Sequence, residues 1–183
     1  MTHPSADMTF PPLPARAANF FKQQEASGRL VRHHILVHAM AQRLCQMMQT
    51  TWPALAMDTA LILMGAAIHD TGKLQVPEEI TGSGHTHEQA GERMLLEHGF
   101  NAEEARFART HGMWPQTALP LEDLMVCMAD TIWTGKRVNE LEEKLCSALA
   151  DRLEEDFWQV FQSLDEVLMN CAAGGEERLV WAR

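Results

Sequence analysis

The sequence has no tyrosine and no long hydrophobic run, and only four of its 183 residues are cysteine. Its longest apolar stretch runs from Ala60 to Ile68, whereas a membrane-spanning helix needs about 20 apolar residues. Residues 1–14 lack the basic start and the apolar core of a secretory signal peptide. These absences predict that the protein does not enter a membrane and that it resides in the cytoplasm.

The few cysteines lie far apart, each within or beside an apolar helical pattern, at Cys45, Cys127, Cys146 and Cys171. They have neither the close pairing of a zinc cluster nor the density of a disulfide-stapled domain. We therefore expect reduced, buried thiols, which also fits the cytoplasm.

Positive charge is scarce as well: 15 lysines and arginines stand against 25 aspartates and glutamates, for a formal net charge of −10. Nucleic acids and anionic membranes bind basic surfaces, so neither a nucleic-acid polymer nor a membrane is an expected partner. A negatively charged small substrate stays compatible with this balance, because a bound metal can reverse the field locally.

What the sequence does have is helical periodicity over most of its length. The proline-containing residues 1–14 are predicted to form a flexible lead-in, and residues 15–183 a single domain. No later stretch alternates convincingly enough to be a strand, and the absence of tyrosine points the same way. We therefore predict an all-α fold, a single helical bundle that ends in a long C-terminal helix.

The expected helices cover about 30–49, 58–69, a stretch that opens at 86, 101–111, 121–132 and 153–168, with a loop over 71–85. Asp58 is the predicted N-cap of the second of these helices. Thr86 and Gln89 have the spacing of a capping box, and so have Asn101 and Glu104. The apolar stripe of the last helix is expected to pack on the core, or against a second copy in a homo-oligomer.

The histidines number nine, which is many for this length, and several of them stand at the ends of predicted helices. His33 and His87 each begin a helix, whereas His69 and His111 each end one. Helix ends can converge on a common cleft. Asp130 stands within an apolar stretch, where a buried carboxylate is costly unless a cation or a donor meets it.

Asp70, which directly follows His69, completes a mixed set of nitrogen and oxygen donors. Such a set suits iron, manganese, nickel or zinc better than calcium. One carboxylate oxygen of Asp70 can serve one ion while the other oxygen reaches a second. The predicted ligands of one or two divalent transition-metal ions are His33, His69, Asp70, His87, His111 and Asp130.

In their order along the chain, these residues and their neighbours resemble the HD-domain family of metal-dependent phosphohydrolases. The matching elements are Arg32-His33 with Val37 and Ala41, His69-Asp70-Thr71-Gly72-Lys73, His87-Glu88-Gln89-Ala90-Gly91, the stretch before His111, and Ala129-Asp130 followed by Gly135 and Arg137. The resemblance covers roughly residues 30–140 and implies two metal positions. The His69-Asp70 doublet with His33 and Asp130 would hold one ion, and His87 with His111 would hold another that Asp70 bridges.

The first histidine ligand has an alternative, because His34 and His38 stand four residues apart, a spacing that can itself bind metal. The helical register favours His33, which shares the face of Val37 and Leu44. At this point His34 stays open as the alternative.

Asp70 and Lys73 are the predicted catalytic residues, and Lys73 and Arg137 are the predicted contacts to substrate phosphate. A metal-activated water would attack the phosphorus, while the ions and Lys73 neutralise charge on the phosphoryl oxygens. The expected activity is hydrolysis of a phosphate ester of a nucleotide or of another small phosphorylated metabolite.

Two other functions could use the same residues. The resemblance extends to HD-fold oxygenases, which hold two irons at these ligands and oxidise their substrate with dioxygen, but the further substrate-handling residues of that class cannot be identified in this sequence. The third function is a non-catalytic regulatory module that binds metal or nucleotide. The complete ligand set argues against such a module, because modules of that kind commonly lose metal residues.

Overall fold

The computed structural model describes residues 8–80 and 86–183, and within these ranges its regular structure is helical, without strands. The fold is all-α, as the sequence predicted. The elements are α1 (Ala15–Gln23), α2 (Gly28–Thr51), α3 (Thr59–Ile68), the 3-10 turns η2 (Thr71–Leu74) and η3 (Pro77–Ile80), α4 (Thr86–Glu97), α5 (Ala102–Ala105), α6 (Phe107–Thr110), α7 (Leu121–Ile132), α8 (Asn139–Leu153), α9 (Phe157–Ala172) and α10 (Gly175–Trp181). Among the helices of this described part, none has the length and the hydrophobicity of a membrane span.

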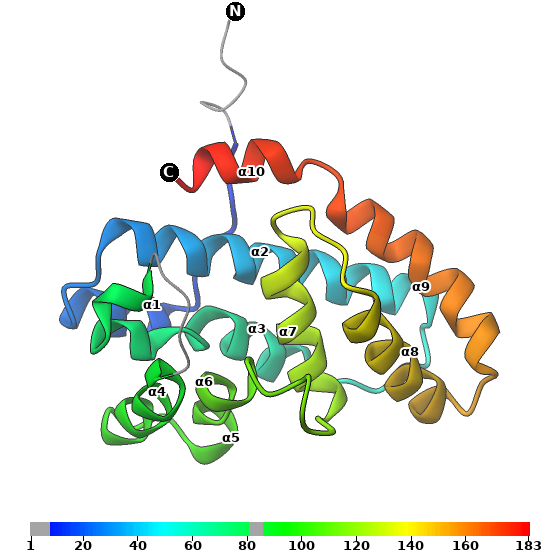
Figure 1. Ribbon diagram of the computed structural model, residues 1–183, viewed down its shortest axis with the longest axis horizontal. Coiled ribbons are helices and arrows are strands. Elements are labelled where there is room, and N and C mark those ends of the chain that lie inside the picture. Colours follow the sequence, from blue (N-terminus) through cyan, green and yellow to red (C-terminus); the bar gives the residue numbers. More distant parts are fainter. Residues whose placement is uncertain (1–7, 81–85) are drawn as a thin grey trace, which may run out of the picture.

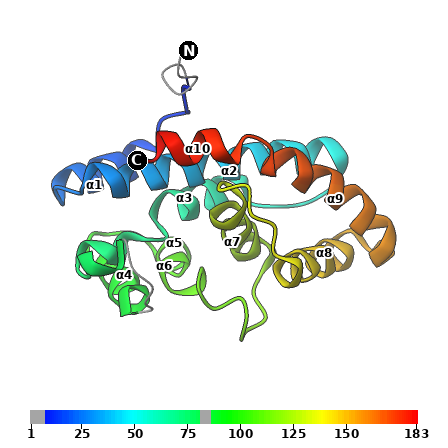
Figure 2. The same cartoon turned by 45° about the horizontal axis from the view of Figure 1, so that its top comes forward.

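The long helix α2 runs across the molecule, and most other elements pack around it (Figure 1). α3 and α7 pack on one side of α2, α9 contacts it toward its C-terminal half, and α4 to α6 form a group beside α3. α10 lies along the side of α2 opposite α3 (Figures 1 and 2). The N-terminal half of α2 therefore lies between α3 and α10.

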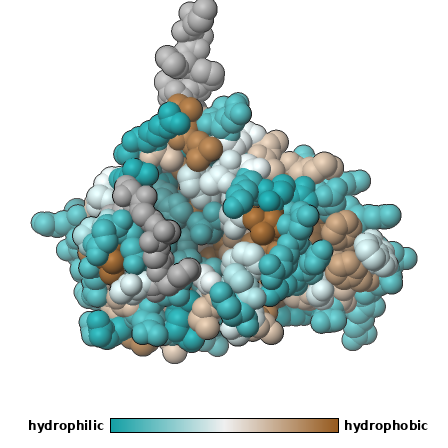
Figure 3. All heavy atoms as spheres, viewed as in Figure 1, coloured by the Kyte–Doolittle hydropathy of each residue, from teal (hydrophilic) through white to brown (hydrophobic). Residues whose placement is uncertain are grey.

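The buried side chains form two hydrophobic cores that meet at α3. The larger core lies among α2, α3, α7, α8 and α9 and includes Leu44, Ile62 and Met125. The smaller core joins α1 to α4 and includes Phe21 and Ile68. Because α3 contributes Ile62 to one core and Ile68 to the other, it is apolar nearly all round, as a central helix has to be. Outside these cores, most of the face seen in Figure 3 is hydrophilic.

Two predicted helix starts are confirmed by their hydrogen bonds. The Asp58 side chain accepts a hydrogen bond of 2.9 Å from the backbone N–H of Leu61, which makes Asp58 the N-cap of α3. Asn101 and Glu104 form the predicted capping box at the start of α5. Short polar side chains at these positions satisfy backbone N–H groups that the first turn of a helix leaves free.

The stretch after α3 differs from the prediction. Residues 71–80 form two 3-10 turns rather than a loop, because Lys73 donates a backbone hydrogen bond to Asp70 and because Pro77, with its fixed φ, starts η3. The run at 81–84 that predicted a break lies outside the described residues.

The predicted helix over 153–168 also differs, because its stripe belongs to two helices. Glu154 has a left-handed backbone with φ 55° and ends α8 just after Leu153. Asp156 then caps α9, accepting hydrogen bonds from the backbone of Trp158 and of the next residue. The remaining apolar positions of the stripe lie on α9.

Candidate metal centre

The predicted ligands come from helices that are far apart in the sequence, and they meet in one place. His33 lies in the N-terminal part of α2, and the His69-Asp70 pair directly follows α3. His87 lies in the first turn of α4, His111 directly follows α6, and Asp130 lies in the last turn of α7. The distances among these side chains divide them into two groups of donor atoms.

The first group surrounds the ring nitrogen Nε2 of His33. This atom lies 3.2 Å from His69 Nε2, 3.2 Å from Asp70 Oδ2 and 3.4 Å from Asp130 Oδ1. Asp130 Oδ1 is also 3.4 Å from His69 Nε2. Two imidazole nitrogens and two carboxylate oxygens thus face one another. The distances between them are those expected between neighbouring ligand atoms around one metal ion.

The second group surrounds the other carboxylate oxygen of Asp70. Asp70 Oδ1 lies 3.1 Å from His87 Nε2 and 3.2 Å from His111 Nε2, and these two nitrogens are 3.3 Å apart. Asp70 therefore contributes one oxygen to each group, and its side chain joins them.

The rings are turned so that Nε2 faces inward, because the other ring nitrogen has a partner on the outside. His69 Nδ1 lies 3.0 Å from the carbonyl oxygen of Ala66, and His111 Nδ1 lies 3.2 Å from that of Phe107. His87 Nδ1 lies 2.5 Å from a carboxylate oxygen of Glu79. Carbonyl and carboxylate oxygens accept hydrogen bonds, so each Nδ1 donates, and Nε2 is the ring nitrogen that each histidine offers to the centre.

The inward-facing atoms are imidazole nitrogens and carboxylate oxygens, which fits a bound cation. Asp70 Oδ1 is buried and accepts no hydrogen bond within the described part of the chain, although two ring nitrogens lie close to it. A buried carboxylate oxygen without a hydrogen bond is costly. A divalent ion would satisfy it together with the two imidazoles, and nitrogen with carboxylate oxygen is the donor set of transition metals.

The charge of both carboxylates is maintained by their histidine neighbours. Burial alone would raise the pKa of Asp70, but the surrounding imidazoles, His69 first among them, outweigh it and hold that pKa well below its usual range. Desolvation acts in the same direction on Asp130, and His69 and His33 likewise reverse it, so the pKa of Asp130 is also lowered. The centre therefore presents two anions at neutral pH.

The apolar surroundings of Asp130 in the sequence suggested a buried acid, but its side chain is 30% exposed. The fully buried acid of α7 is Asp123. Its carboxylate accepts hydrogen bonds from the guanidinium of Arg106, at 2.9 Å, and from the hydroxyl of Thr110, at 2.6 Å. Asp123 lies in the first turn of α7, where α6 covers it, whereas Asp130 lies in the last turn.

The family comparison agrees with this geometry. A family model described as HD domain matches residues 30–156. The chain belongs to the HD-domain family. Proteins of this family are generally metal-dependent hydrolases and form a superfamily of phosphohydrolases. No significant match was found among curated proteins or among solved structures.

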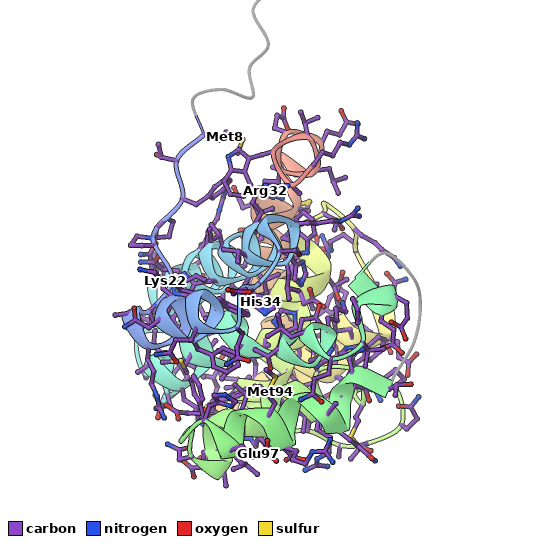
Figure 4. All side chains as sticks on the ribbon, turned by 90° about the vertical axis from the view of Figure 1, so that its left-hand side faces the viewer. Met8, Lys22, Arg32, His34, Met94 and Glu97 are labelled. Carbon is purple, nitrogen blue, oxygen red and sulfur yellow. The ribbon has the colours of Figure 1, made fainter. Side chains whose placement is uncertain are left out.

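His33 and His34, the two candidates for the first histidine of this HD domain, make different contacts. His33 approaches both Asp70 and Asp130, whereas His34 is fully buried and neither of its ring nitrogens has a hydrogen-bond partner within the described residues. The His34 ring stacks on His69 with 5.1 Å between centroids and could still offer a nitrogen to the first group. Figure 4 shows His34 on the inner side of α2, toward α1.

Glu79 is the residue of the centre that the sequence did not indicate. Its carboxylate accepts a hydrogen bond from His87 Nδ1. It also accepts hydrogen bonds of 3.3 Å from the backbone N–H groups of Thr86 and His87. Thr86 therefore lies inside α4, and Glu79 supplies the cap that the Thr86–Gln89 spacing had suggested for Thr86 itself. Glu79 lies across residues 81–85 from the helix that it caps, and no local pattern connects the two.

A cavity of about 400 Å³ opens beside the first group and is lined by His33, Asp70, Lys73 and Trp133 among others. The visible surface is hollowed beneath α10 (Figure 3). The Lys73 ammonium donates a hydrogen bond to Asp70 Oδ2 and also borders this space. A cationic side chain is thus present beside the centre, where the sequence had placed a phosphate contact.

Arg137 lies elsewhere in the HD domain. Its guanidinium forms ion pairs with Glu142, at 2.6 Å, and with Asp165, at 2.7 Å, which fix the start of α8 to α9. It is not among the residues that line the cavity. Because its donors are engaged by carboxylates, we do not assign Arg137 a contact to substrate.

No cysteine is among the candidate metal ligands of the described residues. All four cysteines are free and buried, as the sequence predicted. Burial raises the pKa of the Cys45 thiol to about 12 and that of Cys146 to about 11. These thiols stay protonated at neutral pH, so they lack the thiolate that nucleophilic catalysis or metal binding requires.

Proposed function

We propose that this HD-domain protein hydrolyses a phosphate ester of a nucleotide or of another small phosphorylated metabolite, with divalent transition-metal ions as cofactor. The observation that carries the proposal is the position of Asp70. Its two oxygens belong to separate groups of imidazole donors, and this arrangement suits a pair of ions that share one carboxylate.

In this proposal His33, His69, Asp70 and Asp130 would hold the first ion, and His87, His111 and Asp70 would hold the second. Iron, manganese, nickel and zinc all accept such a set, and the donor atoms alone do not select among them. When bound, such ions lower the pKa of water and withdraw charge from phosphoryl oxygens.

The remaining residues of the site bind and orient the substrate. The Lys73 ammonium, which Asp70 anchors, is proposed to contact a phosphoryl oxygen and to stabilise the charge that develops on it. Leu30 and Trp133 border the cavity with apolar surface. A cavity of about 400 Å³ has the size of small-molecule sites rather than of a polymer groove.

The free thiols agree with a cytoplasmic setting.

The test begins with protein purified without air, whose metal content is measured before a panel of phosphate monoesters is offered. We expect phosphate release that depends on the native metal and is abolished by Asp70→Asn. Asp151→Asn removes one exposed carboxylate on α8 and serves as the matched control, with activity equal to that of the wild type.

Other outcomes would overturn the proposal in distinct ways. Protein without bound metal and without metal-stimulated hydrolysis would refute it. Two irons per chain together with substrate-dependent oxygen consumption would identify an oxygenase. Bound metal with tight nucleotide binding but no turnover would identify a regulatory module.

A further inference from the structure

The cavity beside the metal centre has a second wall that the family match does not include. Its inner side is formed by Asp70, His33 and Lys73, whereas its outer side is formed by Arg29, Leu179, Ala182 and Arg183. The matched span covers residues 30–156. The outer wall therefore lies outside the matched span, chiefly in α10 and the residues that follow it.

The helix α10 is fixed to the rest of the molecule through one buried arginine. The Arg178 guanidinium donates hydrogen bonds to four backbone carbonyl groups, those of Trp133, Cys171, Ala172 and Ala173. These groups come from the end of α7 and the end of α9, so Arg178 joins α10 to both. A wall held by this many hydrogen bonds keeps one position relative to the metal centre.

A close backbone contact and a second arginine complete the attachment. A Cβ atom on Gly175 would lie 2.5 Å from the carbonyl oxygen of Thr134, so only glycine allows α10 to start so near the end of α7. At the other end, Arg32 donates hydrogen bonds to the carbonyl oxygens of Ala182, at 3.3 Å, and Arg183, at 3.0 Å. In Figure 4 Arg32 lies on the side of α2 that faces α10.

Two guanidinium groups on this wall have no protein partner. Within residues 8–80 and 86–183, the side chains of Arg29 and Arg183 make neither an ion pair nor a hydrogen bond, although the chain carries a net charge of −10. Arg32, Arg137 and Arg178, by contrast, are engaged. Guanidinium groups bind carboxylate and phosphate through paired, charge-assisted hydrogen bonds.

We propose that Arg29 and Arg183 form a second anion-binding subsite, so that the substrate carries a further anionic group, a carboxylate or a phosphate, at a distance from the phosphoryl group that is cleaved. This inference rests on the proposed function, which places the phosphoryl group that is cleaved at the metal centre. Leu30, Trp133 and Leu179 line the cavity as well. The part of the substrate that joins its two anions is therefore an apolar chain or a flat ring.

The test uses two matched series of probes: alkyl phosphates of increasing length, and the same compounds with a carboxylate at the far end. We expect wild-type protein to prefer one length of the carboxylated series over its alkyl partner by roughly 10-fold or more in kcat/KM, the scale of a charge-assisted hydrogen bond. The double substitution Arg29→Gln and Arg183→Gln should remove this preference while leaving the alkyl series unchanged. Both side chains are exposed, so the fold does not depend on them.

Arg93→Gln is the matched control, since it removes an equally exposed positive charge on α4, away from the cavity. Equal rates for both series, unaffected by the double substitution, would overturn the subsite and leave the hydrolase intact. Calorimetric binding of the carboxylated probes separates the two proposals if no probe is hydrolysed. Binding that the double substitution weakens would then support the subsite alone, whereas binding that it does not weaken, or no binding, would overturn both.

Discussion

The carboxylate of Glu79 lies against His87 on the side of the imidazole ring that faces away from Asp70, with 2.5 Å between Oε2 and Nδ1. The same carboxylate accepts the backbone N–H groups of Thr86 and His87. One side chain from η3 thus caps α4 and sets the orientation of His87, a proposed ligand in its first turn. The hydrogen bond from His87 is also the main reason that the pKa of Glu79 is lowered.

Glu79→Gln is therefore expected to weaken the second metal position. The amide oxygen accepts less strongly than a carboxylate, so the hydrogen bond from His87 Nδ1 weakens and Nε2 becomes a less basic ligand atom. We expect metal affinity at this position to fall roughly 10- to 100-fold, as is usual when an outer partner of a metal-bound histidine is removed. A metal titration of the two proteins, monitored by calorimetry, measures the change in affinity. Glu78→Gln, at an exposed neighbour, should leave both affinities unaltered.

Substitutions at the two adjacent histidines of α2 distinguish the first ligand. His33→Ala should remove the ion of the first position, because His33 approaches both Asp70 and Asp130. His34→Leu should keep both ions and leave the free energy of unfolding unchanged or raise it by about 1 kcal/mol, because two buried nitrogens without partners are lost. Metal content and denaturant unfolding test both variants. Loss of an ion in His34→Leu would make His34 the ligand instead.

The close approach of η2 to α4 makes Gly72 sensitive to any side chain. A Cβ atom at this position would lie 1.8 Å from the carbonyl oxygen of His87, which is backbone and cannot turn aside. Gly72→Ala should push η2 away from α4 and lower the free energy of unfolding by about 3 kcal/mol. It should also lower metal affinity, because Asp70 and His87 move apart. Gly28→Ala, whose nearest neighbour is a flexible arginine at 3.4 Å, should be tolerated.

The buried Asp123 holds α6 against α7 through Arg106 and Thr110. Asp123→Ala leaves these donors without their acceptor, and we expect a loss of about 3 kcal/mol in the free energy of unfolding, at the lower end for a buried ion pair because the Arg106 side chain is 24% exposed. Chemical denaturation measures the loss. In Glu140→Gln, which removes one partner of an exposed pair with Lys144, the change should stay below about 0.5 kcal/mol. An equal loss in both variants would contradict the structural role of Asp123.

The residues that meet at the candidate centre could be named from the sequence because each of them combines a suitable residue type with a local signal. The His69-Asp70 doublet follows an apolar helix with a recognisable N-cap, and His87 and His111 stand at helix ends. Such patterns are local, since capping and hydrophobic spacing act within a few residues. The all-α fold followed from the same periodicity.

What the sequence did not reveal depends on contacts between distant segments. Glu79 reaches His87 across residues 81–85, and nothing in the spacing marks this acid among its neighbours. The buried acid of α7 is Asp123 rather than Asp130, because burial depends on where a helix ends against its partners. Arg137 stands in a motif-like position, yet Glu142 and Asp165 engage it.

The outer wall of the cavity and the proposed metal ligands lie in different parts of the sequence, and this has a practical consequence. The proposed ligands lie within residues 30–156, whereas α10 and Arg183 lie beyond that span. Changes in this short segment alter the shape and charge of the cavity without touching any of the proposed metal ligands. A library of variants confined to residues 179–183 can therefore redirect selectivity while the reaction centre stays as it is.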